Sequence, residues 1–219
     1  MAGIAEKFHS GMVPHSGDEE SRNFKEVVGL GNELKHLEKL IGSEYVAKVG
    51  IVFDWENWWA LELDSKPSTL VTYIEEIIPF YRALHKQNIG VDFIHPDESL
   101  NAYKVIIAPA SYQVTNDFST KVEDYVKKGG VFITNFFNGI VDEHDRVYLG
   151  GYPGAYKEVL GIYIEEFAPM KEHAVHQIRT EFSDVYNKVW EENIHLRGAK
   201  ALAQFKEGYL ANSPAVQLQ

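Results

Sequence analysis

Residues 49–60 read VGIVFDWENWWA, a buried-strand pattern that runs straight into an acidic, tryptophan-rich segment. Residues 49–53 are apolar and rich in β-branched side chains, which is typical of a strand covered on both faces. We expect the following residues, 54–60, to form a loop at the carboxyl end of that strand. In an open α/β sheet, such loops are where ligands and partners bind.

Strands and helices alternate after this stretch. Residues 70–84 carry apolar side chains at helical spacing, and Thr115 begins a second helix that Gly129 ends. The expected strands are residues 91–94, 103–108 and 131–134. This succession predicts an α/β fold, with a mostly parallel sheet and helices on both of its faces. Residues 175–203 alternate more like antiparallel strands, and residues 213–216 look like a final strand or a cut end, so we expect antiparallel pairing at the C-terminal end.

The residues before the first strand predict a separate helix. Ser16 and Asp18 are both suited to cap its start, and apolar residues then recur at helical spacing until Gly42 closes it. Gly29 and Gly31 each weaken a helix by roughly 1 kcal/mol relative to alanine. We therefore expect this helix to pack closely on a neighbour.

The composition limits which functions are open to the chain. Its 219 residues suffice for one large domain, or one domain plus an appendage. A net charge of −11 argues against binding to nucleic acid or an anionic membrane, because both need clustered lysine and arginine. No apolar run approaches the ~18 residues of a membrane span, and no signal-peptide pattern is present. Cysteine is absent, which excludes disulfides and thiolate sites and permits a reducing compartment, so we expect a cytoplasmic protein.

Two acids in the opening stretch are spaced like a catalytic pair. On an extended backbone, Asp54 and Glu56 would lie on one face, roughly 6.6 Å apart. Retaining glycosidases place their carboxyls about 5–5.5 Å apart and inverting ones about 6.5–9.5 Å apart. An acid at the end of a first parallel strand more often caps a turn or pairs with a cation, and we favour that interpretation.

Three tryptophans lie within five residues of one another. Trp55, Trp58 and Trp59 are costly to expose, so they indicate an interface or a sugar-stacking surface, with core burial under the next helix as the alternative. Residues 142–146 are charged and resemble a metal site in composition, but their spacing matches no known ligand set. A solvated loop or ion pairs between subunits explain that loop better.

The chain lacks the residues that several catalytic classes require. The turn after the strand at 131–134 reads NFFNG and offers neither Ser nor Cys, so a nucleophile of the amidotransferase or hydrolase type is missing. No glycine-rich phosphate-binding motif stands between a strand and a helix. Nine histidines are scattered without a zinc-like pair. We therefore expect neither a cofactor nor a metal.

Three segments together resemble one enzyme family. They are residues 5–15 (AEKFHSGMVPH), residues 52–60 (VFDWENWWA) and residues 138–154, which contain NGIVDE and LGGYPG. All three are similar to segments of the family 42 glycoside hydrolases, which are β-galactosidases, and they occur in the same order. The resemblance extends over nearly the whole chain but covers only the middle of that family's polypeptide.

The resemblance implies a specific domain organisation. In that family a (β/α)8 barrel with both catalytic glutamates comes first. A trimerisation domain with a three-layer flavodoxin-like or class I amidotransferase-like sheet follows, and then a small β domain. Residues 1–41 would be the C-terminal remnant of the barrel, and residues 42–219 the trimerisation domain. The catalytic glutamates would lie upstream of residue 1, so this chain alone is expected to be inactive.

The implied function is assembly, as a homotrimer, of a retaining enzyme that hydrolyses terminal non-reducing β-D-galactosyl residues. Glu6 and His9 match a Glu and a His of the last barrel loop, which are similar to residues that hydrogen-bond the galactose hydroxyls in the intact enzyme. Many relatives are expected to have Ser in place of Asn138, so we assign that position no function. Two other functions stay open: a free-standing flavodoxin-like module that binds a small molecule near Asp54, and a glycosidase that uses Asp54 and Glu56.

Overall fold

The computed structural model describes residues 11–219, and its contacts divide the chain into two units, Met1–Tyr45 and Val46–Gln219. The first unit contains helix α1 (Arg22–Lys35) and a short 3-10 helix, η2 (Glu38–Leu40). The cap of α1 is Ser21, whose hydroxyl accepts a hydrogen bond from the Phe24 amide at 3.3 Å. The sequence-based expectation that Ser16 or Asp18 begins this helix is therefore wrong.

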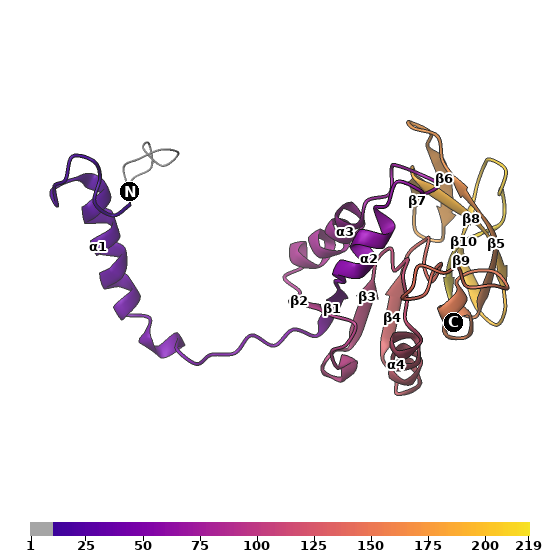
Figure 1. Cartoon of the computed structure of the whole chain (residues 1–219), viewed down its shortest axis with the longest axis horizontal. Coiled ribbons are helices and arrows are strands. Elements are labelled where there is room, and N and C mark those ends of the chain that lie inside the picture. The colour runs from indigo at the N-terminus through magenta and orange to yellow at the C-terminus, as the bar shows by residue number, and fades with distance from the viewer. Residues whose placement is uncertain (1–10) are drawn as a thin grey trace. The chain divides into compact units, whose positions relative to one another are not determined.

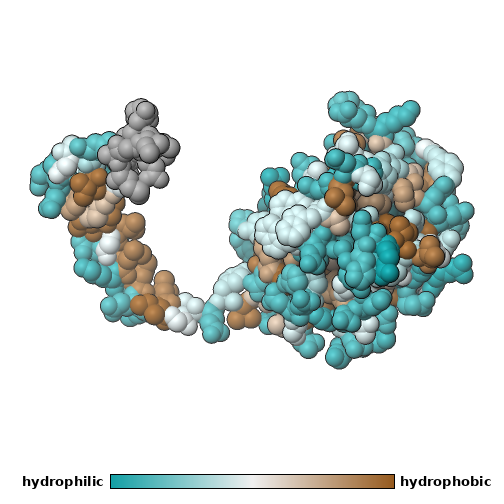
Figure 2. All heavy atoms as spheres, in the orientation of Figure 1, coloured by the Kyte–Doolittle hydropathy of each residue, from teal (hydrophilic) through white to brown (hydrophobic). Residues whose placement is uncertain are grey.

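Helix α1 has an apolar side but buries none of its residues among those that the structure describes. Figure 2 shows hydrophobic residues gathered along this unit. Apart from the nearby backbone of the helix itself, no described atom lies within 4 Å of the position that a Cβ would take on Gly29 or Gly31. The close neighbour expected from these two glycines is thus not found in the described part of the chain.

The second unit is organised around a four-stranded parallel sheet, in the order β2-β1-β3-β4 (Figure 1). Its strands are β1 (Val49–Val52), β2 (Val91–Ile94), β3 (Val105–Ala108) and β4 (Val131–Thr134). Strand β1 is buried along its whole length, as its apolar sequence predicts. The parallel sheet is confirmed.

Helices cover both faces of this sheet because alternate strand residues point to opposite sides. On one face Ile51 and Ile107 share a core with Leu61 of α2 (Trp55–Leu61) and Ile77 of α3 (Tyr73–Lys86). On the other face the buried core includes residues of β1, β3 and α4 (Asn116–Lys127), namely Val52, Ile106, Phe118 and Val122. Thr115 caps α4, as expected.

The C-terminal part consists of antiparallel strands, as the alternating pattern predicts. Strands β10-β9-β6-β7 form one sheet, and β5 pairs with β8. Their bounds are β5 (Ile162–Pro169), β6 (His176–Thr180), β7 (Asp184–Asn187), β8 (Trp190–Leu196), β9 (Lys200–Phe205) and β10 (Pro214–Leu218). Short helical turns η3 (Leu100–Ala102), η4 (Gly154–Tyr156) and α5 (Lys157–Leu160) complete the unit.

An aromatic cluster joins these strands to the parallel sheet. Trp190 of β8 contacts Phe136 and Phe137, which follow β4, and Phe167 of β5. The same Trp190 belongs to the core that contains Ile51. The two parts of the second unit therefore share one hydrophobic core. Over residues 11–219, no helix has both the length and the apolar character needed to cross a bilayer.

Candidate functional site

The carboxyl end of β1 leads directly into helix α2. Asp54 is the N-cap of this helix, and its Oδ1 accepts a hydrogen bond from the Glu56 amide at 2.9 Å. Residues 55–61 are helical, so the expectation of a loop over 54–60 is wrong. Asp54 and Glu56 consequently do not stand as a pair on an extended backbone, and the capping interpretation of Asp54 is confirmed.

Asn57 ties α2 to the segment that follows β3. Its Nδ2 donates to the Ala110 carbonyl at 3.0 Å, and its Oδ1 accepts from the Gln113 amide at 2.8 Å. The side chain is only 2% exposed. Both ends of a buried amide are thus satisfied by backbone, as burial of a polar group requires.

Tyr73 closes the same region from the start of α3. Its hydroxyl accepts a hydrogen bond from the Asp54 amide at 3.1 Å and donates to the Val52 carbonyl at 3.3 Å. Burial raises the pKa of the Tyr73 phenol to about 12. At neutral pH the phenol therefore keeps its proton and acts as a fixed bridge between β1 and α3.

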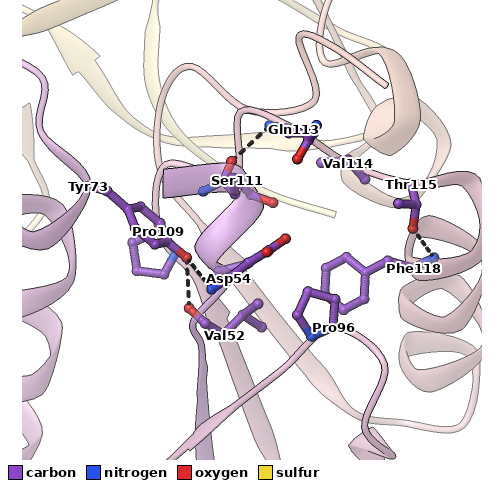
Figure 3. Close-up of a pocket in the computed structure, with 12 residues that line it drawn as sticks. Val52, Asp54, Tyr73, Pro96, Pro109, Ser111, Gln113, Val114, Thr115 and Phe118 are labelled. Atoms are coloured by element: carbon purple, nitrogen blue, oxygen red, sulfur yellow. Dashed lines mark hydrogen bonds between the residues drawn. The ribbon is translucent and has the colours of Figure 1, made fainter. Parts of the chain in front are cut away.

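A hollow lies between these groups at the carboxyl ends of β1 and β3, and Figure 3 shows the Asp54 carboxylate directed into it. Its walls include Ser111, Gln113, Pro96 and Phe118, and its empty volume, about 320 Å³, includes its open mouth. Strand order reverses between β1 and β3, which is where open α/β sheets bind ligands. Tyr73 is hydrogen-bonded to the end of β1, and Asn57 to the segment after β3, so both of these wall residues already have partners within the chain.

The turn after β4 holds no nucleophile. Phe137 has a φ of +57°, and its side chain is buried in the aromatic cluster. Asn138, to which the sequence assigned no function, is buried and accepts a hydrogen bond from the Ser111 amide at 2.8 Å. Its role is to hold the β3 and β4 ends together.

Asn135, directly after β4, links the end of that strand to the residues after β3 and to α3. Its Oδ1 accepts from the Ala110 amide at 2.6 Å, and its Nδ2 donates to Glu76 of α3 at 2.8 Å. Burial raises the pKa of the Glu76 carboxyl to about 7. Ala110 has a positive φ of +42°. Its carbonyl accepts a hydrogen bond from Asn57 and its amide donates one to Asn135, and these two bonds hold it in that conformation.

Glu192 of β8 lies buried beside the aromatic cluster. Its Oε1 accepts hydrogen bonds from the Phe137 amide at 2.8 Å and from Trp190 Nε1 at 3.0 Å. Burial raises the pKa of this carboxyl to about 7. Sequence reasoning missed Glu192, because an acid in an expected strand gives no sign that its partner is an amide 55 residues away.

The three tryptophans differ in exposure. Trp58 packs against the core of the parallel sheet, whereas Trp55 is 52% exposed and Trp59 is 65% exposed. Trp55 stacks on Trp58 with ring centroids 5.3 Å apart. Core burial therefore accounts for Trp58 but not for the other two, which remain available to a partner.

The charged loop at residues 142–146 closes on itself. Arg146 Nη2 lies 2.9 Å from Asp142 Oδ2, and the amides of His144 and Arg146 donate to Asp142 Oδ1. Among residues 11–219, no group of three or more His, Cys, Asp or Glu side chains could hold a metal ion. Glu6 and His9 lie outside the described residues.

Comparison with known proteins identifies the family. The family model described as the beta-galactosidase trimerisation domain matches residues 47–219. The chain is 72% identical over 214 residues to the beta-galactosidase LacZ of Heyndrickxia coagulans, and 48% identical over 212 residues to the beta-galactosidase bgaB of Geobacillus kaustophilus. These alignments cover 98% and 97% of this chain and 32% of each relative.

A solved structure agrees with this match. The crystal structure of beta-galactosidase from Bacillus circulans sp. alkalophilus superposes with a TM-score of 0.94 at 38% identity, over 99% of this chain and 33% of that one. The chain spans about a third of the length of the curated relatives it matches. It belongs to the β-galactosidase trimerisation domain family of the family 42 glycoside hydrolases.

Proposed function

We propose that this chain assembles a β-galactosidase into a homotrimer. The observation that carries the proposal is the family match, which covers residues 47–219 and so nearly all of the unit Val46–Gln219. Exposed Trp55 and Trp59 support it, because large aromatic side chains are enriched where proteins meet.

The proposed enzyme is a retaining glycosidase that releases terminal non-reducing β-D-galactosyl residues. One glutamate would protonate the leaving oxygen and the other would form a galactosyl-enzyme, which water then resolves. Both glutamates would belong to a barrel outside these 219 residues, so the chain alone would be inactive. The relatives named beta-galactosidase, about three times as long as the matched region, support this.

Residues 1–41 are, in this proposal, the last part of that barrel, and residues 42–219 are the trimerisation domain. The exposed apolar side of α1 supports the first assignment, since a helix that shows Leu30 and Leu34 to solvent needs a cover. Glu6 and His9 would hold the galactose hydroxyls. A carboxylate accepts from two hydroxyls, and an imidazole supplies one donor and one acceptor.

The parallel sheet is, we propose, of the flavodoxin-like or class I amidotransferase-like kind, in a protein of the cytoplasm. The strand order β2-β1-β3-β4 supports the first part, because it is the order of the first four flavodoxin-like strands. The absence of cysteine agrees with a reducing compartment.

A small-molecule-binding module is the alternative, and the hollow beside Asp54 is the observation in its favour. The chain's own hydrogen bonds count against it, because Asn57 and Tyr73 in the wall of the hollow already have partners and offer a ligand few free polar groups. Assembly therefore remains the preferred function.

Light scattering coupled to size exclusion tests the proposal on this chain at tens of micromolar. We expect a mass three times that of the 24.9 kDa chain, falling on dilution. A monomer at every concentration would contradict self-assembly by this chain. A small molecule that binds such a monomer and protects the Asp54 region would favour the alternative.

A further inference from the structure

One surface of the second unit gathers exposed aromatic side chains from three elements. We define the aromatic patch as Trp55 and Trp59 of α2, Phe93 of β2 and Tyr81 of α3. Phe93 is 52% exposed, and the other three members are also exposed. Strand β2 is the edge strand of the parallel sheet, and α3 lies beside it (Figure 1). Monomeric proteins rarely leave large contiguous apolar surfaces uncovered unless they serve binding.

Ring contacts make the patch continuous. Trp59 and Trp55 have centroids 6.5 Å apart, and Trp55 meets Phe53 edge-on at 5.0 Å. Phe53 then contacts Phe93 at 6.4 Å, and Phe93 stacks on Tyr81 at 5.9 Å. The exposed rings therefore form one surface that crosses from α2 over the sheet edge to α3.

Aromatic residues beneath the aromatic patch support it. Phe53 also contacts Trp58 at 5.9 Å and the buried Tyr73 at 5.7 Å. Tyr73 is in turn hydrogen-bonded to both Val52 and Asp54. Because the rings stand on helices and a strand, a partner that covers them loses little side-chain entropy, which favours tight binding.

Charge points to the identity of the partner. Arg82 and Lys86 are exposed on α3 next to Tyr81 and His85, and no carboxylate within residues 11–219 forms an ion pair with either. The chain as a whole has 32 acidic and 21 basic residues. A second copy carries a net charge of −11 and therefore has unneutralised carboxylates that can pair with these two cations.

We infer that the aromatic patch is one half of the contact between copies of this chain, an inference that rests on the proposed trimer. A closed ring of three copies uses a head-to-tail interface, so each copy contributes two different surfaces. The aromatic patch is one of them and inserts its rings into an acid-flanked surface of the next copy. Trp59 and Phe93 are its anchors.

Matched substitutions test this in the full chain. Phe93→Glu and Trp59→Glu each place an acid within the aromatic patch, whereas Phe182→Glu makes the same change at a phenylalanine that is 96% exposed between β6 and β7. Sedimentation velocity over a dilution series gives the concentration at which half of the chains are assembled. We expect both patch variants to raise it at least about tenfold and the Phe182→Glu control to leave it within about twofold.

Far-UV circular dichroism verifies that each variant is folded. If Phe93→Glu disturbs the sheet edge, Trp59→Glu, on an exposed helix surface, still tests the aromatic patch. Assembly by the parent chain that neither patch variant weakens would overturn the inference and leave the proposed trimer standing. A parent chain that stays monomeric would remove both. Saturable lactose binding that Trp59→Glu abolishes without weakening the trimer would assign the patch to sugar and also overturn the inference.

Discussion

The Glu192 carboxylate accepts a hydrogen bond from the backbone amide of Phe137, with Oε1 and N 2.8 Å apart. Phe137 stands at a φ of +57°, in the left-handed region that side chains other than glycine seldom adopt. Glu192 therefore fastens the turn after β4 to strand β8. This hydrogen bond adds a polar link to the aromatic cluster that joins the parallel sheet to the antiparallel part of the same unit.

Glu192 makes stability depend on pH. Burial raises its carboxyl pKa from 4.5 to about 7, so the folded chain holds this proton more tightly than the unfolded chain does. The free energy of unfolding should fall by roughly 3 kcal/mol as pH rises between these two values. Glu192→Gln retains an oxygen for both donors but cannot ionise, so we expect a flatter decline in urea titrations across this range.

Burial also raises the carboxyl pKa of Glu76 to about 7, so Glu76 likewise lowers the free energy of unfolding as pH rises. Because Glu76 still titrates in Glu192→Gln, that variant should lose only part of the pH dependence. Glu181→Gln, which makes the same change at an exposed side chain, is the matched control. Equal slopes for Glu192→Gln and the parent chain would show that Glu192 does not titrate in this way.

Asn57 should contribute strongly to stability. Asn57→Ala leaves the Gln113 amide without its partner and removes one of two donors to the Ala110 carbonyl, and we expect a loss of roughly 1–3 kcal/mol in the free energy of unfolding. Chemical denaturation measures it. Asn101→Ala, at an exposed asparagine, should change stability by less than about 0.5 kcal/mol. Similar values for the two variants would contradict the bridging role.

Asp54 should act as a helix cap and not as a catalytic acid. Asp54→Ala is expected to cost about 1 kcal/mol, whereas Asp54→Asn, which keeps an acceptor for the Glu56 amide, should be nearly neutral. The parent chain should not hydrolyse an aryl β-galactoside. Hydrolysis that Asp54→Asn abolishes would instead make Asp54 part of an active site.

Two glycines should respond in opposite directions to alanine. A Cβ on Gly50 would lie 2.9 Å from Ile94 Cδ1 and 3.1 Å from Ile106 Cδ1, so Gly50→Ala should destabilise the second unit by about 1–3 kcal/mol. Gly31 has open space around it, and Gly31→Ala should favour helix α1 by about 1 kcal/mol. Circular dichroism during thermal unfolding measures the effect of each substitution on stability. A stabilising Gly50→Ala would show that a Cβ at this position does not clash with Ile94 and Ile106.

Glu6 and His9 should matter in a polypeptide that carries the proposed barrel. Glu6→Gln and His9→Ala are each expected to weaken galactose binding by about 1–3 kcal/mol, because each removes a hydrogen-bonding group from the sugar. Steady-state kinetics with an aryl β-galactoside and inhibition by galactose measure the effect. Unchanged constants in both variants would remove these residues from the sugar site.

Local sequence sufficed for much of the sheet. The strands at 91–94 and 131–134 and the Thr115 cap follow from apolar runs and turn residues that act within a few positions. Within the second unit, local patterns failed at two elements. Residues 55–61 form a helix because Asp54 caps them, although seven residues are too few to show a period. Strand β5, IYIEEFAP, escaped notice because its register shifts where it pairs with β8, which interrupts the alternation.

Residue types and short spacings were enough to predict the family, the buried first strand, the class of sheet and the absence of a nucleophile after β4. Which polar groups meet, such as Asn57 with Ala110 and Glu192 with Phe137, could be seen only in the folded molecule. The tertiary structure also decided that Trp58 is covered while Trp59 is exposed. The reason is that these contacts depend on how elements pack in three dimensions, and the two hydrogen-bonded pairs join residues more than fifty positions apart, which no local pattern records.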